Sequence, residues 1–260
     1  EGLVERYPLT TVIVLALIPH LLGSVVNITY NQLFIVDNLE PSQQSAFLRL
    51  VLTYNAIVYP ICLSIIIRKA IPVFRALRAI EQQKTYSADQ FTSARRTAVS
   101  WSKWGLILSC AGWLPGGFLF PAVLDSIAGP ISREIYLHFA VSFTVSGLIA
   151  MTYCFMSLEL FSVRFVYPQL LAEASQPVRR ARDELRSVPR RLAAVQLLSG
   201  SIPLLAAVML LSVGSAEVLQ WFGCRFLLTT LICAGMVGFG LSLLAAGFIN
   251  DTVRALMQRE

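Results

Sequence analysis

The sequence is poor in charge and in histidine, and it lacks the motifs on which soluble enzymes commonly depend. Only 14% of its 260 residues are charged, and only two residues are His. No GxxxxGK[ST] phosphate loop, Rossmann GxGxxG turn, HExxH zinc helix or kinase signature occurs in the chain. We therefore predict no catalytic residue, no metal site and no cofactor within these residues. Whether a full-length protein is an enzyme stays open.

Cysteine pairs of the kind that bind metal or cycle between thiol and disulfide are also missing. The five cysteines are far apart in sequence, and no CxxC spacing occurs. All but Cys224 fall inside apolar segments. We predict that they are small core residues with reduced thiols.

Apolar residues are abundant instead. They make up 56% of the chain, which is too apolar for a soluble domain of this length. A bilayer core about 30 Å thick is crossed by a helix of roughly 20 apolar residues, and six segments reach that length. The predicted fold class is therefore an all-α, polytopic integral membrane bundle of six transmembrane helices in one domain. The predicted spans are residues 9–36, 46–67, 104–124, 135–163, 192–213 and 226–249.

Positive charge is confined to two of the connections between these spans. Residues 68–103 and 164–191 hold most of the Lys and Arg, whereas the other three connections are short and hold few cations. By the positive-inside rule the two basic loops and both termini are cytoplasmic. The predicted location is the bacterial inner (plasma) membrane, crossed several times. Because the net charge of +6 is explained by topology, no nucleic-acid partner is expected.

The first basic loop has a helical pattern of its own. Pro72 is expected to start a helix there, with an apolar face and a charged face, as a stalk continuing the second span. A similar stalk is expected after spans four and six. The apolar face comprises Val73, Phe74, Leu77 and Ile80, and the charged face comprises Arg75, Arg78 and Glu81. Kinks are expected at the five prolines within spans, namely Pro19, Pro60, Pro115, Pro121 and Pro203.

A set of polar side chains falls inside the spans, in the half of the membrane that we predict to be external. One interpretation is that they hydrogen-bond between helices at about 0.6 kcal/mol per bond. The other is an outward-facing pocket that binds an external ligand, because polar groups within spans often mark functional sites. The candidate ligand-binding residues are Asn27, Tyr30, Asn31, Tyr54, Asn55 and His138.

Two other polar residues within spans are expected to have structural roles. His20 is next to Pro19, and we expect it to bond a carbonyl that this proline leaves free. Glu159 is near the inner end of the fourth span, and we expect it to reach the membrane interface or a nearby Arg.

The last four spans resemble a known family. The residues that carry the resemblance are Phe120-Pro121, His138-Phe139, Ser142, Gly147-Leu148-Ile149-Ala150, Val163-Arg164, Tyr167-Pro168, Arg190-Arg191-Leu192, Ile202-Pro203-Leu204-Leu205 and Gly238-Phe239. This pattern resembles the membrane domain attached to a group of bacterial serine/threonine protein kinases, over about the C-terminal two thirds of the chain. The resemblance implies a kinase domain outside these residues, which this part anchors or regulates.

Three classes of function follow as hypotheses. The first is a membrane-anchoring or sensory domain of a bacterial signalling protein, with a serine/threonine kinase or a nucleotide cyclase in the same polypeptide. Similar six-helix modules precede bacterial nucleotide cyclases, and Ala70-Ile71-Pro72 faintly resembles their couplers. The second is a small-molecule transporter or channel, and the third is an intramembrane enzyme. The expected partners are the lipid bilayer, the cytoplasmic effector domain and a second copy in a homodimer.

Overall fold

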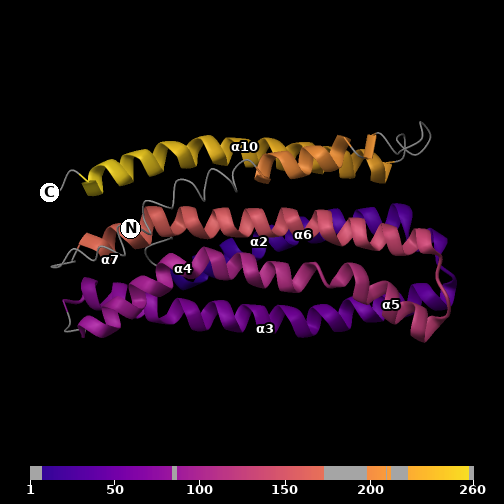
Figure 1. The fold of residues 1–260 in the computed structure, drawn as a ribbon, viewed down its shortest axis with the longest axis horizontal. Helices are drawn as coiled ribbons and strands as arrows, with labels where there is room; N and C mark the ends of the chain where they lie inside the picture. Colours follow the sequence, from indigo (N-terminus) through magenta and orange to yellow (C-terminus); the bar gives the residue numbers. More distant parts are fainter. Residues whose placement is uncertain (1–7, 84–86, 173–197, 209, 212–221, 258–260) are drawn as a thin grey trace.

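The computed structural model describes residues 8–83, 87–172, 198–208, 210–211 and 222–257 (Figure 1). Within these ranges the chain is almost entirely helical and contains no strand, so the all-α prediction is confirmed. The helices are α2 (Pro8–Phe34), η1 (Val36–Asn38), α3 (Pro41–Glu81), α4 (Ala88–Trp113), α5 (Gly116–Ala128), α6 (Arg133–Phe161), the π-helical η2 (Ser162–Val166), α7 (Tyr167–Ala172) and α10 (Phe222–Met257). A further helical segment covers Leu198–Val208.

Five helical stretches are long and apolar enough to cross a membrane. They are Leu9–Asn38, Pro41–Glu81, Asp89–Ala128, Arg133–Leu170 and Gly223–Leu244. Of the fifth predicted span, 192–213, the described part is the short apolar helix Leu198–Val208 together with residues 210–211. Residues 192–197, 209 and 212–213 lie outside the described residues. The structure therefore supports a membrane protein, and a sixth span stays a prediction.

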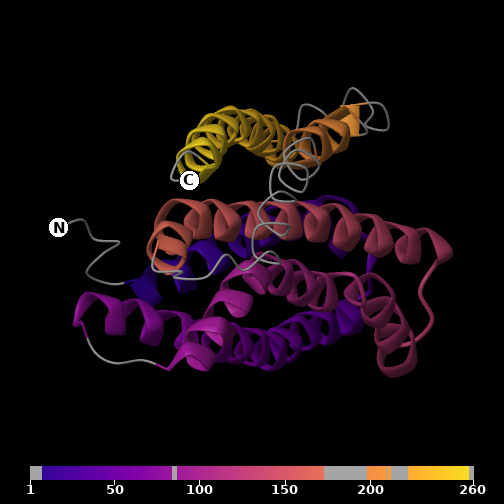
Figure 2. The same cartoon turned by 60° about the vertical axis from the view of Figure 1, so that its left-hand side comes forward.

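The helices are arranged in layers around a central pair. α2 and α6 pack together at the centre, with α3, α4 and α5 on one side and α10 with residues 198–208 and 210–211 on the other (Figures 1 and 2). The central pair approaches closely at Gly23, where an added Cβ would stand 2.9 Å from the Ser146 carbonyl oxygen. Small residues allow such contacts between membrane helices.

The stalk predicted after the second span is present, but Pro72 does not begin it. α3 runs unbroken for 41 residues with Pro60 and Pro72 inside it. At 1.5 Å per residue it is roughly 60 Å long, about twice the thickness of a bilayer core. The predicted apolar face packs into the core formed with α4 and α7, while the predicted charged face is exposed. Because that face is covered, the stalk is one wall of a packed helical layer.

Most of segment 68–103, predicted as a basic loop, is helix. α3 continues to Glu81 and α4 begins at Ala88, and residues 84–86 between them lie outside the described residues. Ser87 caps α4 by accepting a hydrogen bond from the Gln90 backbone N–H, and the Gln90 side chain accepts one from the Ser87 N–H. This reciprocal pattern is a sequence signature of a helix start. In the second basic segment, residues 164–172 are helical and 173–191 lie outside the described residues.

The prolines at which we predicted kinks differ in whether they interrupt a helix. The third span is interrupted between α4 and α5, where Leu114 and Pro115 separate the two helices. Pro19, Pro60 and Pro121 lie inside continuous helices. Beyond the break, Gly116 and Gly117 lie against Phe143 and Ala140 of α6. The interruption therefore coincides with a close approach of α5 to α6.

Candidate ligand-binding cavities

The six predicted ligand-binding residues lie in one region but do not line one pocket. Asn27, Tyr54 and Asn55 line a cavity of about 90 Å³ between α2, α3 and α4. Tyr30 and His138 line a second cavity, of about 430 Å³, on the opposite side of α2. We call the first the central cavity and the second the lateral cavity. The single outward-facing pocket predicted from the sequence is thus divided in two.

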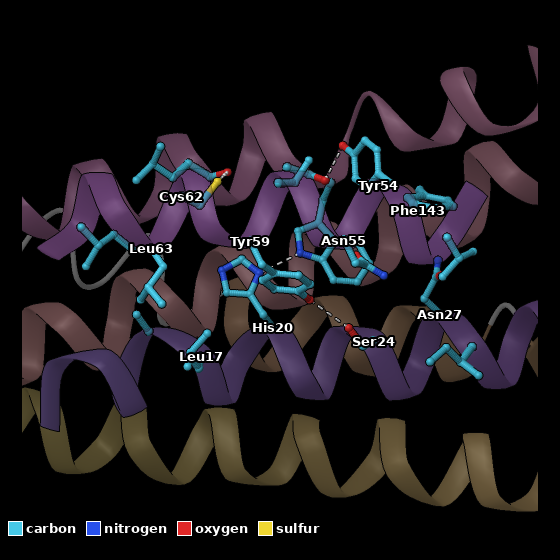
Figure 3. Close-up of a pocket in the computed structure, with 18 of the residues that line it drawn as sticks. Leu17, His20, Ser24, Asn27, Tyr54, Asn55, Tyr59, Cys62, Leu63 and Phe143 are labelled. Carbon is cyan, nitrogen blue, oxygen red and sulfur yellow. Dashed lines mark hydrogen bonds between the residues drawn. The ribbon is translucent and has the colours of Figure 1, made fainter. Parts of the chain in front are cut away.

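The central cavity lies among the polar side chains of two facing helices (Figure 3). α2 contributes His20, Ser24 and Asn27, and α3 contributes Tyr54, Asn55 and Tyr59. The Tyr59 hydroxyl is 3.3 Å from the Ser24 hydroxyl, and the Tyr59 ring meets the His20 ring edge to face at 6.1 Å. The two helices are therefore connected across the cavity by polar and aromatic contacts.

His20 is held by side chains, not by a carbonyl freed at Pro19. The Trp113 indole N–H donates to His20 Nδ1 over 2.9 Å, and His20 Nε2 is 3.1 Å from the Ser109 hydroxyl. Ser109 in turn donates to the Gly105 carbonyl oxygen over 2.7 Å. Since the Ser109 proton is used there and Nδ1 accepts, His20 carries its proton on Nε2. His20 thereby fixes α2 to α4.

Sequence reasoning placed His20 correctly within a span but did not assign it to the cavity. The spacing between His20 and the other polar residues of α2 could have assigned it. His20, Ser24, Asn27 and Asn31 follow one another at intervals of four, three and four residues, which puts all four on one face of α2. A polar stripe of this length within an apolar span marks a face that meets other polar groups.

Tyr54 and Asn55 differ in how their polar groups are satisfied. The Tyr54 hydroxyl donates to the Gly112 carbonyl oxygen over 2.8 Å, close to the break between α4 and α5. The Asn55 side chain is exposed, lines the central cavity and takes part in none of the hydrogen bonds among the described residues. Tyr54 is thus a structural contact, whereas the Asn55 amide is available to a molecule in the cavity.

A buried amide pair connects the central cavity's Asn27 to α6. Asn31 donates to the Asn27 side-chain oxygen over 3.0 Å, and Asn27 donates to the Ser142 hydroxyl of α6 over 3.3 Å. Both amides are buried, and the Asn31 side-chain oxygen has no partner among the described residues. Asn27 and Asn31 therefore fit the helix-packing interpretation better than the ligand-binding one.

The lateral cavity lies between α2, α6, α10 and segment 198–211 and is mainly apolar. At one end the Tyr30 hydroxyl is 2.9 Å from His138 Nδ1, and the His138 ring stacks on Phe34 at 5.7 Å. Deeper in the cavity, Ser146 is fully buried and its hydroxyl has no partner among the described residues. Tyr30 and His138 thus close a polar end of an otherwise apolar space.

Glu159, which we expected to reach the membrane interface or a nearby Arg, lies inside the helix bundle. It is fully buried and accepts a hydrogen bond from Ser102 of α4. Within the described ranges, His, Cys, Asp and Glu form no group of three that could hold a metal ion. The five cysteines are free thiols.

Comparison of the chain with protein-family models, with curated proteins and with solved structures finds no match. The resemblance to the kinase-associated membrane domain therefore stays a prediction.

Proposed function

We propose that this chain is the membrane-anchoring and sensory domain of a bacterial signalling protein. In this proposal six helices cross the inner membrane, both termini lie in the cytoplasm, and a serine/threonine kinase outside these residues is the effector. A small polar molecule in the central cavity shifts α2 against α3, and α3 carries the shift to the cytoplasmic end. The kinase as effector rests on the sequence resemblance alone, and a nucleotide cyclase is the alternative effector.

The observation that carries the proposal is the Asn55 amide. It lies within an apolar helix, lines the central cavity and has no hydrogen bond to the described residues. An amide without a partner in an apolar medium costs roughly 2–7 kcal/mol. A polar molecule that enters the cavity and bonds the amide offsets part of this cost.

The length of α3 supports the relay. From Asn55 to Glu81 the helix is continuous, which corresponds to about 39 Å at 1.5 Å per residue. Along its last turns Val73, Ala76 and Ala79 are buried against the neighbouring helices. A packed helix of this kind moves as a unit, and small shifts of packed helices are a common switching mechanism.

The test is an Asn55→Leu substitution in the full-length protein, with Thr53→Leu as the matched control. Both residues are exposed polar side chains on α3, but Thr53 does not line the central cavity. We expect Asn55→Leu to change the basal effector activity in native membranes by about fivefold or more, the lower end of typical coupling between sites. Thr53→Leu should leave it unchanged, with equal amounts of folded protein for both variants.

Two results would overturn the proposal. One is a full reading frame with no effector segment on either side of these residues. The other is substrate-dependent flux into liposomes that contain the purified protein, which would make it a transporter or channel.

A further inference from the structure

A third cavity adjoins the lateral cavity. It has a volume of about 330 Å³ and lies between the start of α3 and the connection from α5 to α6. Its polar lining includes Asn38, Glu40, Gln43, Ser132 and Glu134, and we call it the polar vestibule. It shares Phe34, Glu134 and His138 with the lateral cavity, so the two spaces meet at these side chains.

The charged side chains that line the vestibule are both acidic. The carboxylates of Glu40 and Glu134 line it and both residues are exposed, while no Lys or Arg belongs to its lining. A concave site lined by charges of one sign concentrates ions of the opposite sign. The vestibule therefore selects for a cationic group.

The lateral cavity, in contrast to the polar vestibule, is mainly apolar. Its volume of about 430 Å³ is within the usual range for small-molecule sites, and apolar side chains such as Val26, Val141 and Leu231 make up most of its walls. Beyond its polar end the cavity also has Ser146, whose buried hydroxyl has no partner among the described residues. It lies two helical turns from His138, about 12 Å along α6. An occupant with a hydrogen-bonding oxygen at that depth would satisfy it.

We infer that the vestibule and the lateral cavity together bind an amphipathic amine. Its ammonium group lies between Glu40 and Glu134, its apolar chain passes His138 into the lateral cavity, and a carbonyl or hydroxyl oxygen on the chain bonds Ser146. This site is separate from the central cavity, and its test requires no effector.

The test is photolabelling of the purified protein in phosphatidylcholine liposomes. The probe is an N-acyl diaminooctane with a diazirine in its acyl chain, so that it has an amine, an amide oxygen and an apolar tail. The control probe has the same chain with a carboxylate in place of the amine. Labelled residues are mapped by mass spectrometry.

We expect saturable labelling of α6 near Val141 and of α10 near Leu231 by the amine probe, and weaker labelling by the carboxylate probe. Replacing both Glu40 and Glu134 by Gln should raise the half-saturating concentration of the amine probe about fivefold or more. Asp37→Asn is the matched control, because Asp37 is an exposed acid at the same end that lines neither space. It should leave the concentration unchanged.

A variant that fills the cavity provides a second measurement. Val141→Phe should reduce labelling by both probes, whereas Thr144→Phe, at an exposed position of the same helix outside the cavity, should not. Equal labelling by the two probes, labelling spread over all lipid-facing helices, or no difference between the Gln variant and Asp37→Asn would each refute the site.

Discussion

Asn27 and Asn55 show that the same residue type can have opposite roles in neighbouring helices. Asn27 is buried and makes two side-chain hydrogen bonds, to Asn31 and to Ser142. Asn55 is exposed and makes none among the described residues. From the sequence both were equally good candidates, because burial and partners depend on which helix lies opposite.

This difference gives a matched pair of substitutions. Asn27→Leu removes both bonds and leaves the Asn31 amide without a partner, so we expect the free energy of unfolding to fall by about 1–3 kcal/mol. Asn55→Leu removes no bond, and we expect the same quantity to be unchanged or raised. Steric trapping in bicelles measures both values. Equal losses for the two variants would contradict the assignment of Asn27 to packing and Asn55 to the cavity.

At the scale of helices, close backbone approaches decide which pairs form the centre of the bundle. Gly23 lets α2 approach α6, since an added Cβ would stand 2.9 Å from the Ser146 carbonyl oxygen and 3.2 Å from Ala150. The carbonyl belongs to the helix backbone and cannot rotate away. Gly240 of α10 has no atom within 4 Å of the position that a Cβ would take.

We therefore expect Gly23→Ala to lower the free energy of unfolding by about 1–3 kcal/mol, the usual cost of an overpacked contact. Gly240→Ala should leave it unchanged or raise it slightly, because Ala is the better helix former. Thermal unfolding in detergent, followed by circular dichroism, compares the two. A loss at Gly240 as large as that at Gly23 would show that glycine flexibility, not close contact, explains the effect.

Helix boundaries were harder to predict than helix existence. Each of the four spans predicted between residues 9 and 163 lies within helix apart from the break at Leu114 and Pro115 and the turn at Ile35, while the helices extend beyond the hydropathy limits. α4 starts at Ala88, 16 residues before the predicted span, because the Ser87 cap and buried residues such as Ala94, Ala98 and Trp101 stabilise a polar helix outside the apolar window. Hydropathy detects only the part of a helix that is uniformly apolar.

At the scale of the whole molecule, the two ends of the bundle differ in their charged residues. The end of α3, the start of α4 and α7 lie at one end of the bundle, and η1 and the connection from α5 to α6 lie at the other (Figure 1). The first end holds the cations Arg75, Arg78 and Arg164 with Glu81, whereas the second holds the acids Asp37, Glu40 and Glu134 with Arg133. By the positive-inside rule we predict that the first end faces the cytoplasm.

Reporter fusions at Gln83, Ser126 and Gly214 test this orientation and the number of spans together. We expect cytoplasmic, external and external locations, from paired alkaline phosphatase and green fluorescent protein activities. An external Gln83 together with a cytoplasmic Ser126 would show that the bundle has the opposite orientation in the membrane. A cytoplasmic Gly214, which lies outside the described residues, would show that segment 192–213 does not cross the membrane.

Composition and pattern alone determined that this protein is helical and apolar enough for a membrane, because helix formation and lipid solubility depend on local runs of side chains. They also placed the charged and apolar faces of the stalk, since a period of 3.6 residues is a local property. Only the tertiary structure decided that Asn27 bonds Asn31 and Ser142, that His20 bonds Trp113 and Ser109, and that α2 divides one expected pocket into two. Those outcomes depend on which helices become neighbours, and contacts between residues a hundred positions apart have no local signal.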